Sequence, residues 1–156
     1  MKKRGGFVVA IEHFRTARGL VKKLVDGLSE EQLFAVPQGY ANNIAWNAAH
    51  VVVTQQLILY KLSGLELHVS EEAVESFRKG TGLEKITPKL FWEAMDFLVE
   101  APEQLSKDYE RGVFESFETY ETSTGIVLHN IDEAILFNNY HEGIHLGYMM
   151  AMRRSI

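Results

Sequence analysis

The chain contains no cysteine, and this absence excludes disulfide bonds, cysteine nucleophiles and thiolate ligands to a metal. Any metal site must therefore be built from nitrogen and oxygen ligands. The chain also lacks an apolar run long enough to cross a bilayer: the run Val51 to Val53, for example, is followed at once by Thr54 and two glutamines.

Basic residues are outnumbered by acidic ones. Lys and Arg number 16 against 21 Asp and Glu, which gives a formal charge of -5 and opposes the phosphate-neutralising surface that nucleic-acid binding requires. The first residues are basic, but the apolar stretch that follows, Phe7 to Ile11, stops at Glu12 and is too short for an export signal. We expect a cytoplasmic protein that binds neither nucleic acid nor membrane.

The length and the apolar content predict one folded domain. A chain of 156 residues fits a single domain, residues 1–156, and is large enough to bury a substantial core. The hydrophobic fraction of 46%, with 9 Phe, 6 Tyr and 2 Trp, supplies the side chains for that core and makes disorder implausible.

Apolar residues recur at the spacing of amphipathic helices in four long segments. The predicted helices cover Phe7 to Leu28, a segment that Asn42 or Asn43 caps and that runs to Ser63, Pro88 through Leu105, and Asn130 to about Arg153. The segments between the second and third helices and between the third and fourth are long. Together they predict an all-α fold, a four-helix bundle with long crossover connections.

Local signals mark the ends of these helices. Ser29 and Gln32 form a capping box, Thr87 before Pro88 is a strong helix start, and Gly64 can end the second helix in the left-handed conformation. Pro102 should kink or interrupt the third helix, because it removes one backbone hydrogen bond. Residues 65–85 read as a polar connector with a short helix from Ser70, and residues 112–125 as a strand-like or irregular connection.

Two histidines stand on one face of the last predicted helix. His141 and His145 are four residues apart, so their side chains lie one turn from each other and can share a metal ion. His50 lies in the middle of the apolar stripe of the second helix. Three converging imidazoles would form a divalent-metal site with open positions for water or substrate. The alternative is that these are histidines of the core or surface whose hydrogen bonds are satisfied.

Glu142 and Gly143 lie between the two histidines of the last helix and bear on what the motif means. His141 to His145 reads literally as H-E-x-x-H, in which Glu142 would be the general base on a metal-bound water, so Glu142 is a candidate catalytic residue of a metallohydrolase. The chain offers little sheet to hold an extended peptide, which weighs against a protease. Gly143 weakens the helix by about 1 kcal/mol relative to Ala, and close packing of a neighbouring helix would offset this cost.

Several further side chains are candidates for the surroundings of the site. Asn47, Asn138 and Glu142 could orient a ligand imidazole, and Trp46 and Tyr148 could line a pocket, although local hydrogen bonding and plain core packing are the alternatives. The other histidines, His13, His68 and His129, are expected to be solvated.

At these two motifs the sequence resembles the DinB-like family of metal-dependent four-helix proteins. The matching pieces are Asn43-Ile44-Ala45-Trp46 leading to His50, and His141 to Gly147 leading to Arg153-Arg154, with the Thr122 to Gly125 approach to the last helix also similar. The resemblance implies a four-helix bundle, commonly a homodimer, with a divalent metal, zinc or nickel, on His50, His141 and His145.

The resemblance also implies an activity. Better understood members transfer a low-molecular-weight thiol, such as bacillithiol, mycothiol or glutathione, to small electrophiles. Such an S-transferase suits a cysteine-free chain, because the nucleophile comes with a cosubstrate. Two alternatives stay open, a non-catalytic bundle in which a metal is structural or sensing, and a metallohydrolase that uses Glu142.

Overall fold

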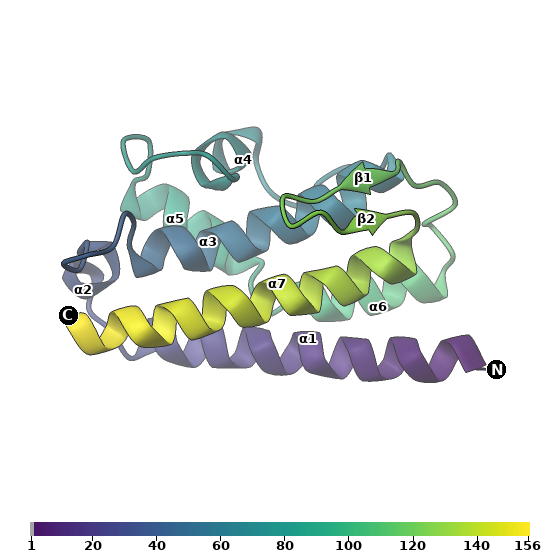
Figure 1. Cartoon of the computed structure of the whole chain (residues 1–156), viewed down its shortest axis with the longest axis horizontal. Coiled ribbons are helices and arrows are strands. Elements are labelled where there is room, and N and C mark those ends of the chain that lie inside the picture. The colour runs from purple at the N-terminus through teal and green to yellow at the C-terminus, as the bar shows by residue number, and fades with distance from the viewer. Residues whose placement is uncertain (1) are drawn as a thin grey trace.

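The computed structural model describes residues 2–156, which fold into a helical bundle with one small hairpin (Figure 1). The long helices are α1 (Lys2–Asp26), α3 (Ile44–Gln55) and α7 (Ile131–Met152), and the fourth arm is made of α5 (Pro88–Asp96) and α6 (Ala101–Glu110). Short helices α2 (Glu30–Phe34) and α4 (Glu71–Phe77) lie in the connections. The all-α four-helix fold expected from the sequence is confirmed.

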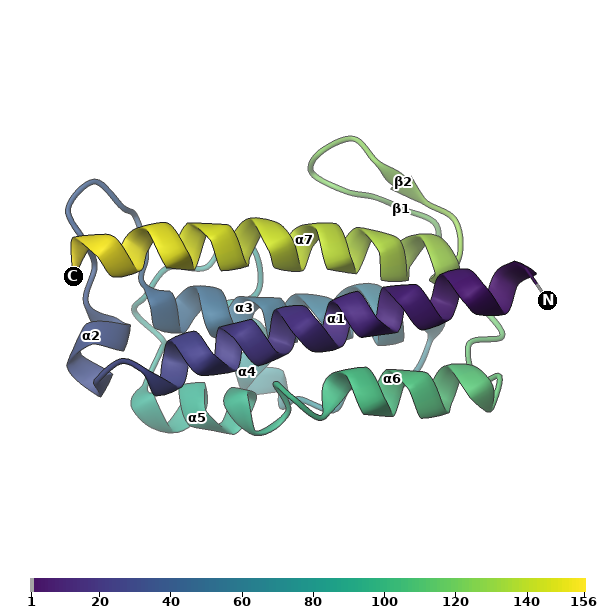
Figure 2. The ribbon, with the colours of Figure 1, turned by 90° about the horizontal axis from the view of Figure 1, so that it is seen from below.

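The direction of the arms explains the length of the connection between α3 and α5. In Figure 1, α1 and α7 run from the right to the left, whereas α3 and the α5–α6 arm run from the left to the right. The chain must therefore cross the length of the bundle between α3 and α5, and the segment that contains α4 makes this crossover. Figure 2 shows α7 and α1 side by side, with the α5–α6 arm below them.

Side-chain caps fix the starts of the helices where the sequence predicts them. The Ser29 hydroxyl accepts from the Gln32 amide and completes the capping box, and Asn43 accepts from the Trp46 amide at 2.8 Å. Thr87 and Asn130 cap α5 and α7 in the same way. Gly64 follows the second arm with φ 71°, the left-handed conformation that a residue without a Cβ adopts without strain.

The structure adds detail to the sequence expectation in three places. The third arm is two helices, and Pro102 lies in the first turn of α6, where its missing amide costs no helical bond. The second arm continues beyond α3 as a π-helical turn, Gln56–Tyr60, and a 3₁₀ turn, Lys61–Ser63. The connection before α7 holds an antiparallel pair of short strands, β1 (Tyr120–Glu121) and β2 (Val127–Leu128).

The core consists of two apolar clusters that lie towards opposite ends of the bundle. One contains Val21, Val53 and Met149, and the other contains Phe14, Ile58 and Ile135. Along α1, Arg18 lies between Phe14 and Val21, so a charged side chain separates the two clusters. Within residues 2–156 no helix is both long enough and apolar enough to cross a membrane.

Candidate metal centre

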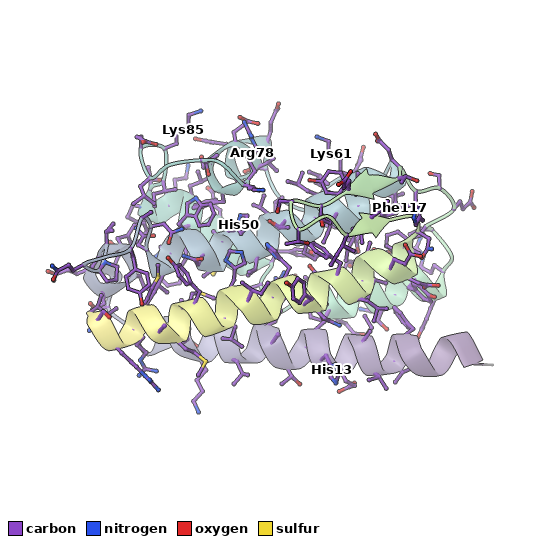
Figure 3. All side chains as sticks on the ribbon, viewed as in Figure 1. His13, His50, Lys61, Arg78, Lys85 and Phe117 are labelled. Carbon is purple, nitrogen blue, oxygen red and sulfur yellow. The ribbon has the colours of Figure 1, made fainter. Side chains whose placement is uncertain are left out.

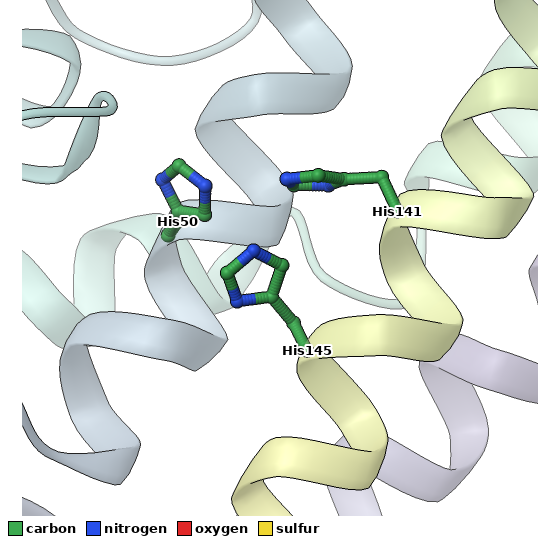
Figure 4. A group of neighbouring side chains, drawn as sticks. All are labelled: His50, His141 and His145. Atoms are coloured by element: carbon green, nitrogen blue, oxygen red, sulfur yellow. The ribbon is translucent and has the colours of Figure 1, made fainter. Parts of the chain in front are cut away.

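Three imidazole rings from two helices converge inside the bundle. His50 projects from α3, and His141 and His145 project from successive turns of α7, so that the rings face one another (Figure 4). Each ring offers one nitrogen to the group, and these three nitrogens lie within 4.8 Å of one another. Metal-to-imidazole bonds of about 2.0–2.1 Å bring ligand nitrogens somewhat closer together than this. Small ring rotations can therefore bring all three nitrogens to one ion.

Two of the three rings are held by hydrogen bonds on the side away from the cluster. His50 Nδ1 lies 2.7 Å from the carbonyl oxygen of Phe77, and His145 Nδ1 lies 2.8 Å from Asn47 Oδ1. Because both oxygens only accept, each Nδ1 must carry the hydrogen, and Nε2 keeps its lone pair. Orientation of this kind is what metal-binding histidines receive from their surroundings.

The amide of Asn47 is itself fixed. Its nitrogen donates to the Asn43 carbonyl at 2.8 Å and to Asn42 Oδ1 at 2.9 Å, which leaves Oδ1 as the atom that faces His145. The structure thus assigns Asn47 the orienting role that the sequence suggested. His141 differs, because its Nδ1 is buried and has no hydrogen-bond partner among the described residues. A bound cation would satisfy the chemistry of this donor set: three neutral nitrogens, two already oriented.

Burial keeps all three rings uncharged near neutral pH. Loss of water lowers the pKa of His50 to about 4, and the nearby positive charge of Lys79 acts in the same direction. Burial, together with the neighbouring histidines and Arg18, lowers the pKa of His141 to about 2, and burial beside His50 lowers the pKa of His145 to about 4. A neutral imidazole is the form that binds a metal.

These pKa values predict that the metal-free protein loses stability in mild acid. Below pH 6.5 the unfolded chain protonates its histidines, whereas the folded rings stay neutral until about pH 4, so unfolding takes up protons and acid favours it. Each ring contributes about 1.4 kcal/mol per pH unit within that window. Urea denaturation with a chelator at pH 7, 6 and 5 should show the loss, and His141→Leu should reduce its slope. A slope unchanged by His141→Leu would contradict the prediction.

The cluster opens onto a pocket. A cavity of about 280 Å³ lies between the second arm, the crossover segment, the β1–β2 connection and α7, and His50 and His141 form part of its wall. Thr54 stands where the cluster meets the pocket, with its hydroxyl 3.3 Å from His50 Nε2. Among the described residues, no Asp, Glu, Cys or further His joins the group of three. The arrangement therefore leaves one side of the cluster accessible to a small molecule.

Glu142 does not share this site. Both of its oxygens accept from the Arg18 guanidinium at 2.8–3.0 Å, and both side chains are fully buried. Burial raises the pKa of Glu142, and the charge of Arg18 opposes that shift. Because both oxygens accept from the guanidinium, the pairing favours the ionised carboxylate. This geometry makes Glu142 the buried partner of Arg18 rather than a free carboxylate beside the cluster.

Arg18 ties several elements together. Beyond Glu142 of α7, it donates to the carbonyl oxygens of Leu98, before α6, and Val51, in α3. The sequence contains a signal for this residue, because Arg18 interrupts the apolar stripe of α1 four residues after Phe14 and three before Val21. A charged residue at such a position is rarely buried without a partner.

The packing also shows where the other side chains lie that were expected near the site. Trp46 stacks on the His50 ring, with 4.4 Å between centroids, and Tyr148 contacts Tyr40, so neither lines the pocket. Tyr148 is 39% exposed rather than inward. Asn138 is buried and its side chain donates a hydrogen bond to Glu142, while its Oδ1 lacks a partner among the described residues, so no contact shows that it orients an imidazole.

The expected close packing against Gly143 is wrong, because a Cβ added there would meet no atom within 4 Å. Its helical cost is therefore not offset within the single chain. The three remaining histidines are exposed, as expected: His13, His68 and His129. His68 also stacks on Phe97.

The relationship to known proteins agrees with this geometry. A search of curated proteins found no match. The family model of the DinB superfamily, whose members are typically metal-dependent, matches residues 13–149, a range that includes all three clustered histidines. Because the match covers most of its length, the chain belongs to the DinB superfamily.

Proposed function

We propose that His50, His141 and His145 bind a divalent transition metal, zinc or nickel, and that the protein is an enzyme that transfers a low-molecular-weight thiol to small electrophiles. The observation that carries the proposal is the pocket beside the cluster, because a catalytic metal keeps a position open whereas a structural one is closed by a fourth protein ligand. Nitrogen ligands on a cysteine-free chain suit both of these metals.

The reaction is a substitution. A new bond forms between the thiol sulfur and a carbon of the electrophile, the bond from that carbon to its leaving group breaks, and the thiol proton passes to solvent. When bound, a divalent cation supplies Lewis acidity, which makes a thiol easier to deprotonate at neutral pH. The chain itself contributes the orientation of the rings through Phe77 and Asn47, and the pocket that positions the reactants.

The two alternative functions receive less support. A purely structural metal does not explain why His50 and His141 border a cavity of about 280 Å³. A metallohydrolase needs a carboxylate free to take a proton from water, and both oxygens of Glu142 are engaged by Arg18.

A thiol-transfer assay tests the proposal. Protein reconstituted with zinc or nickel is mixed with a thiol and a chloronitrobenzene, and formation of the thioether is followed by absorbance. We expect turnover that depends on added metal and falls at least about 100-fold in His145→Ala, since loss of one of three ligands should disable the site. His13→Ala, an exposed histidine on α1 labelled in Figure 3, is the matched control and should leave the rate unchanged. Rates equal to those of the buffer with every thiol would refute the transferase proposal.

We also propose that two copies associate through α7. One face of this helix exposes the row Leu136, Tyr140, Ile144 and Tyr148, and no charged residue interrupts it. Gly143 and Gly147 lie beside this row of projecting side chains, and because they have no side chain they form notches on the helix surface, with open space around both. Because projections and notches share one face, the surface is complementary to itself, as a two-fold symmetric dimer requires. A second copy would also account for the exposed glycines.

Sedimentation equilibrium tests the association. The wild type should sediment with twice the mass of the chain, and Ile144→Glu should be monomeric, because it places a charge in an apolar interface. Val99→Glu, which adds the same charge at an exposed apolar position next to α6, is the control and should stay dimeric. A monomeric wild type at high concentration would refute the dimer.

A further inference from the structure

The pocket beside the histidine cluster has an unusual charge for this protein. Lys61 and Lys79 line it, and no Asp or Glu does so among the described residues. The whole chain carries more acidic than basic residues, 21 against 16. A cavity wall with two cations and no anion therefore departs from the average surface of the molecule.

Neither lysine forms an ion pair with any residue that the structure describes. The ion pairs within the described residues involve other basic residues, including Lys22, Lys89 and Lys107, but neither Lys61 nor Lys79. Both lysines are exposed, so they can meet an incoming anion. The lining also contains four hydroxyl groups, those of Thr54, Tyr120, Thr122 and Ser123. Thr54 already contacts His50 and Thr122 already contacts Thr124, so the Tyr120 and Ser123 hydroxyls are the ones that can donate to an anion.

The two lysines lie at different distances from the histidines. Lys79 is two residues after Phe77, whose carbonyl oxygen contacts His50, so it stands close to the cluster. Lys61 is eleven residues after His50 on the same arm, about 16 Å along the helix axis. Figure 3 labels His50 between the helices and Lys61 near the hairpin. Leu57, Ile58 and Phe137 provide an apolar wall to the same cavity.

We propose that this pocket selects a thiol with a carboxylate at the end remote from its sulfur, rather than an uncharged thiol. The sulfur end faces His50 and His141, the apolar wall contacts the body of the molecule, and the carboxylate meets Lys61 and the hydroxyl groups at the hairpin end of the pocket. This inference rests on the proposed transferase function and names the charge of its cosubstrate. A carboxylate is favoured over a phosphate because the lining holds neither an arginine nor a helix N-terminus.

The first experiment measures the pocket alone, without a metal or a reaction. Binding of hexanoate and of 1-hexanol to the metal-free protein is followed by NMR titration. Hexanoate should bind at least about fivefold more tightly, the effect of one exposed ion pair. The variant Lys61→Gln/Lys79→Gln should lose this preference. Lys85→Gln, an exposed lysine outside the pocket that Figure 3 also labels, is the control and should retain it.

The second experiment uses the metal-loaded protein. The KM for 6-mercaptohexanoate should rise about fivefold or more in Lys61→Gln, whereas kcat should stay within about twofold because Lys61 lies at the end of the pocket remote from the histidines. The KM for 6-mercapto-1-hexanol should not change. An equal rise of the KM for both thiols would show that the lysine shapes the pocket without recognising the carboxylate, and would overturn the inference.

The two proposals can fail separately. If hexanoate and hexanol bind the wild type equally, or the double variant keeps the preference, the inference on charge is wrong whatever the activity. If the carboxylate preference is found but no thiol is transferred, the transferase proposal fails and the assignment of the sulfur end fails with it. The anion-selective pocket then belongs to another reaction.

Discussion

Replacing Arg18 with methionine is expected to lower the free energy of unfolding by about 3–5 kcal/mol, the cost of leaving a buried charge without its partner. The reason is that Glu142 is fully buried and both of its oxygens depend on this guanidinium. The carbonyl oxygens of Val51 and Leu98 lose a donor in the same variant. Methionine fills much of the volume, so the loss reports the charge rather than a cavity.

Two further variants separate the ion pair from general damage to α1. Arg15→Met removes an arginine one turn earlier, whose partners Glu12 and Glu103 are exposed, and should cost at most about 1 kcal/mol. Arg18→Met/Glu142→Met removes both buried charges and should recover most of the stability, because an apolar pair needs no compensation. Urea denaturation measures all four proteins. An Arg18→Met variant as stable as Arg15→Met would show that the pair contributes little.

Removal of His50 should abolish metal binding. We expect protein purified without added metal to carry about one transition-metal ion per chain, and His50→Ala to carry less than about a tenth of that, since two imidazoles from adjacent turns form a much weaker site than three. Elemental analysis of both proteins provides the measurement. His129→Ala, which removes an exposed histidine outside the cluster, should bind like the wild type.

A milder variant at the same site gives a graded result. Asn47→Ala removes the oxygen that faces His145 Nδ1 and should weaken metal binding by about 10–100-fold without abolishing it. If neither the wild type nor His50→Ala carries stoichiometric metal, and added zinc or nickel binds both equally, the assignment of the three histidines as ligands is wrong.

The helices could be read from the sequence because their ends are determined locally. Ser29, Asn43, Thr87 and Asn130 each cap a helix within three residues along the chain, so their roles need no knowledge of the fold. The spacing of His141 and His145 is local in the same sense, and the structure brings His50 to them. That convergence depends on α3 lying beside α7, which the sequence suggests only through its apolar stripes.

The features that the sequence does not predict depend on contacts between segments that are distant along the chain. Arg18 and Glu142 are separated by 124 residues, so nothing near either residue reveals the pair. Lys79 comes from the crossover and Thr122 from the hairpin connection, and they meet at the pocket only because the bundle folds around it. The break in the third arm before Pro102 was predicted as an interruption, but the proline begins a helix rather than bending one.

The hydrogen bonds that hold the His50 and His145 rings differ in whether a single substitution can remove the acceptor. His145 depends on a side chain, so one codon change at Asn47 deletes its acceptor. His50 depends on a peptide oxygen, which every residue at position 77 would supply. A single substitution can therefore remove the hydrogen bond to His145. The hydrogen bond to His50 is lost only through an insertion, a deletion or a displacement of the crossover segment. The backbone path of the crossover is therefore constrained even at positions where its side chains can vary.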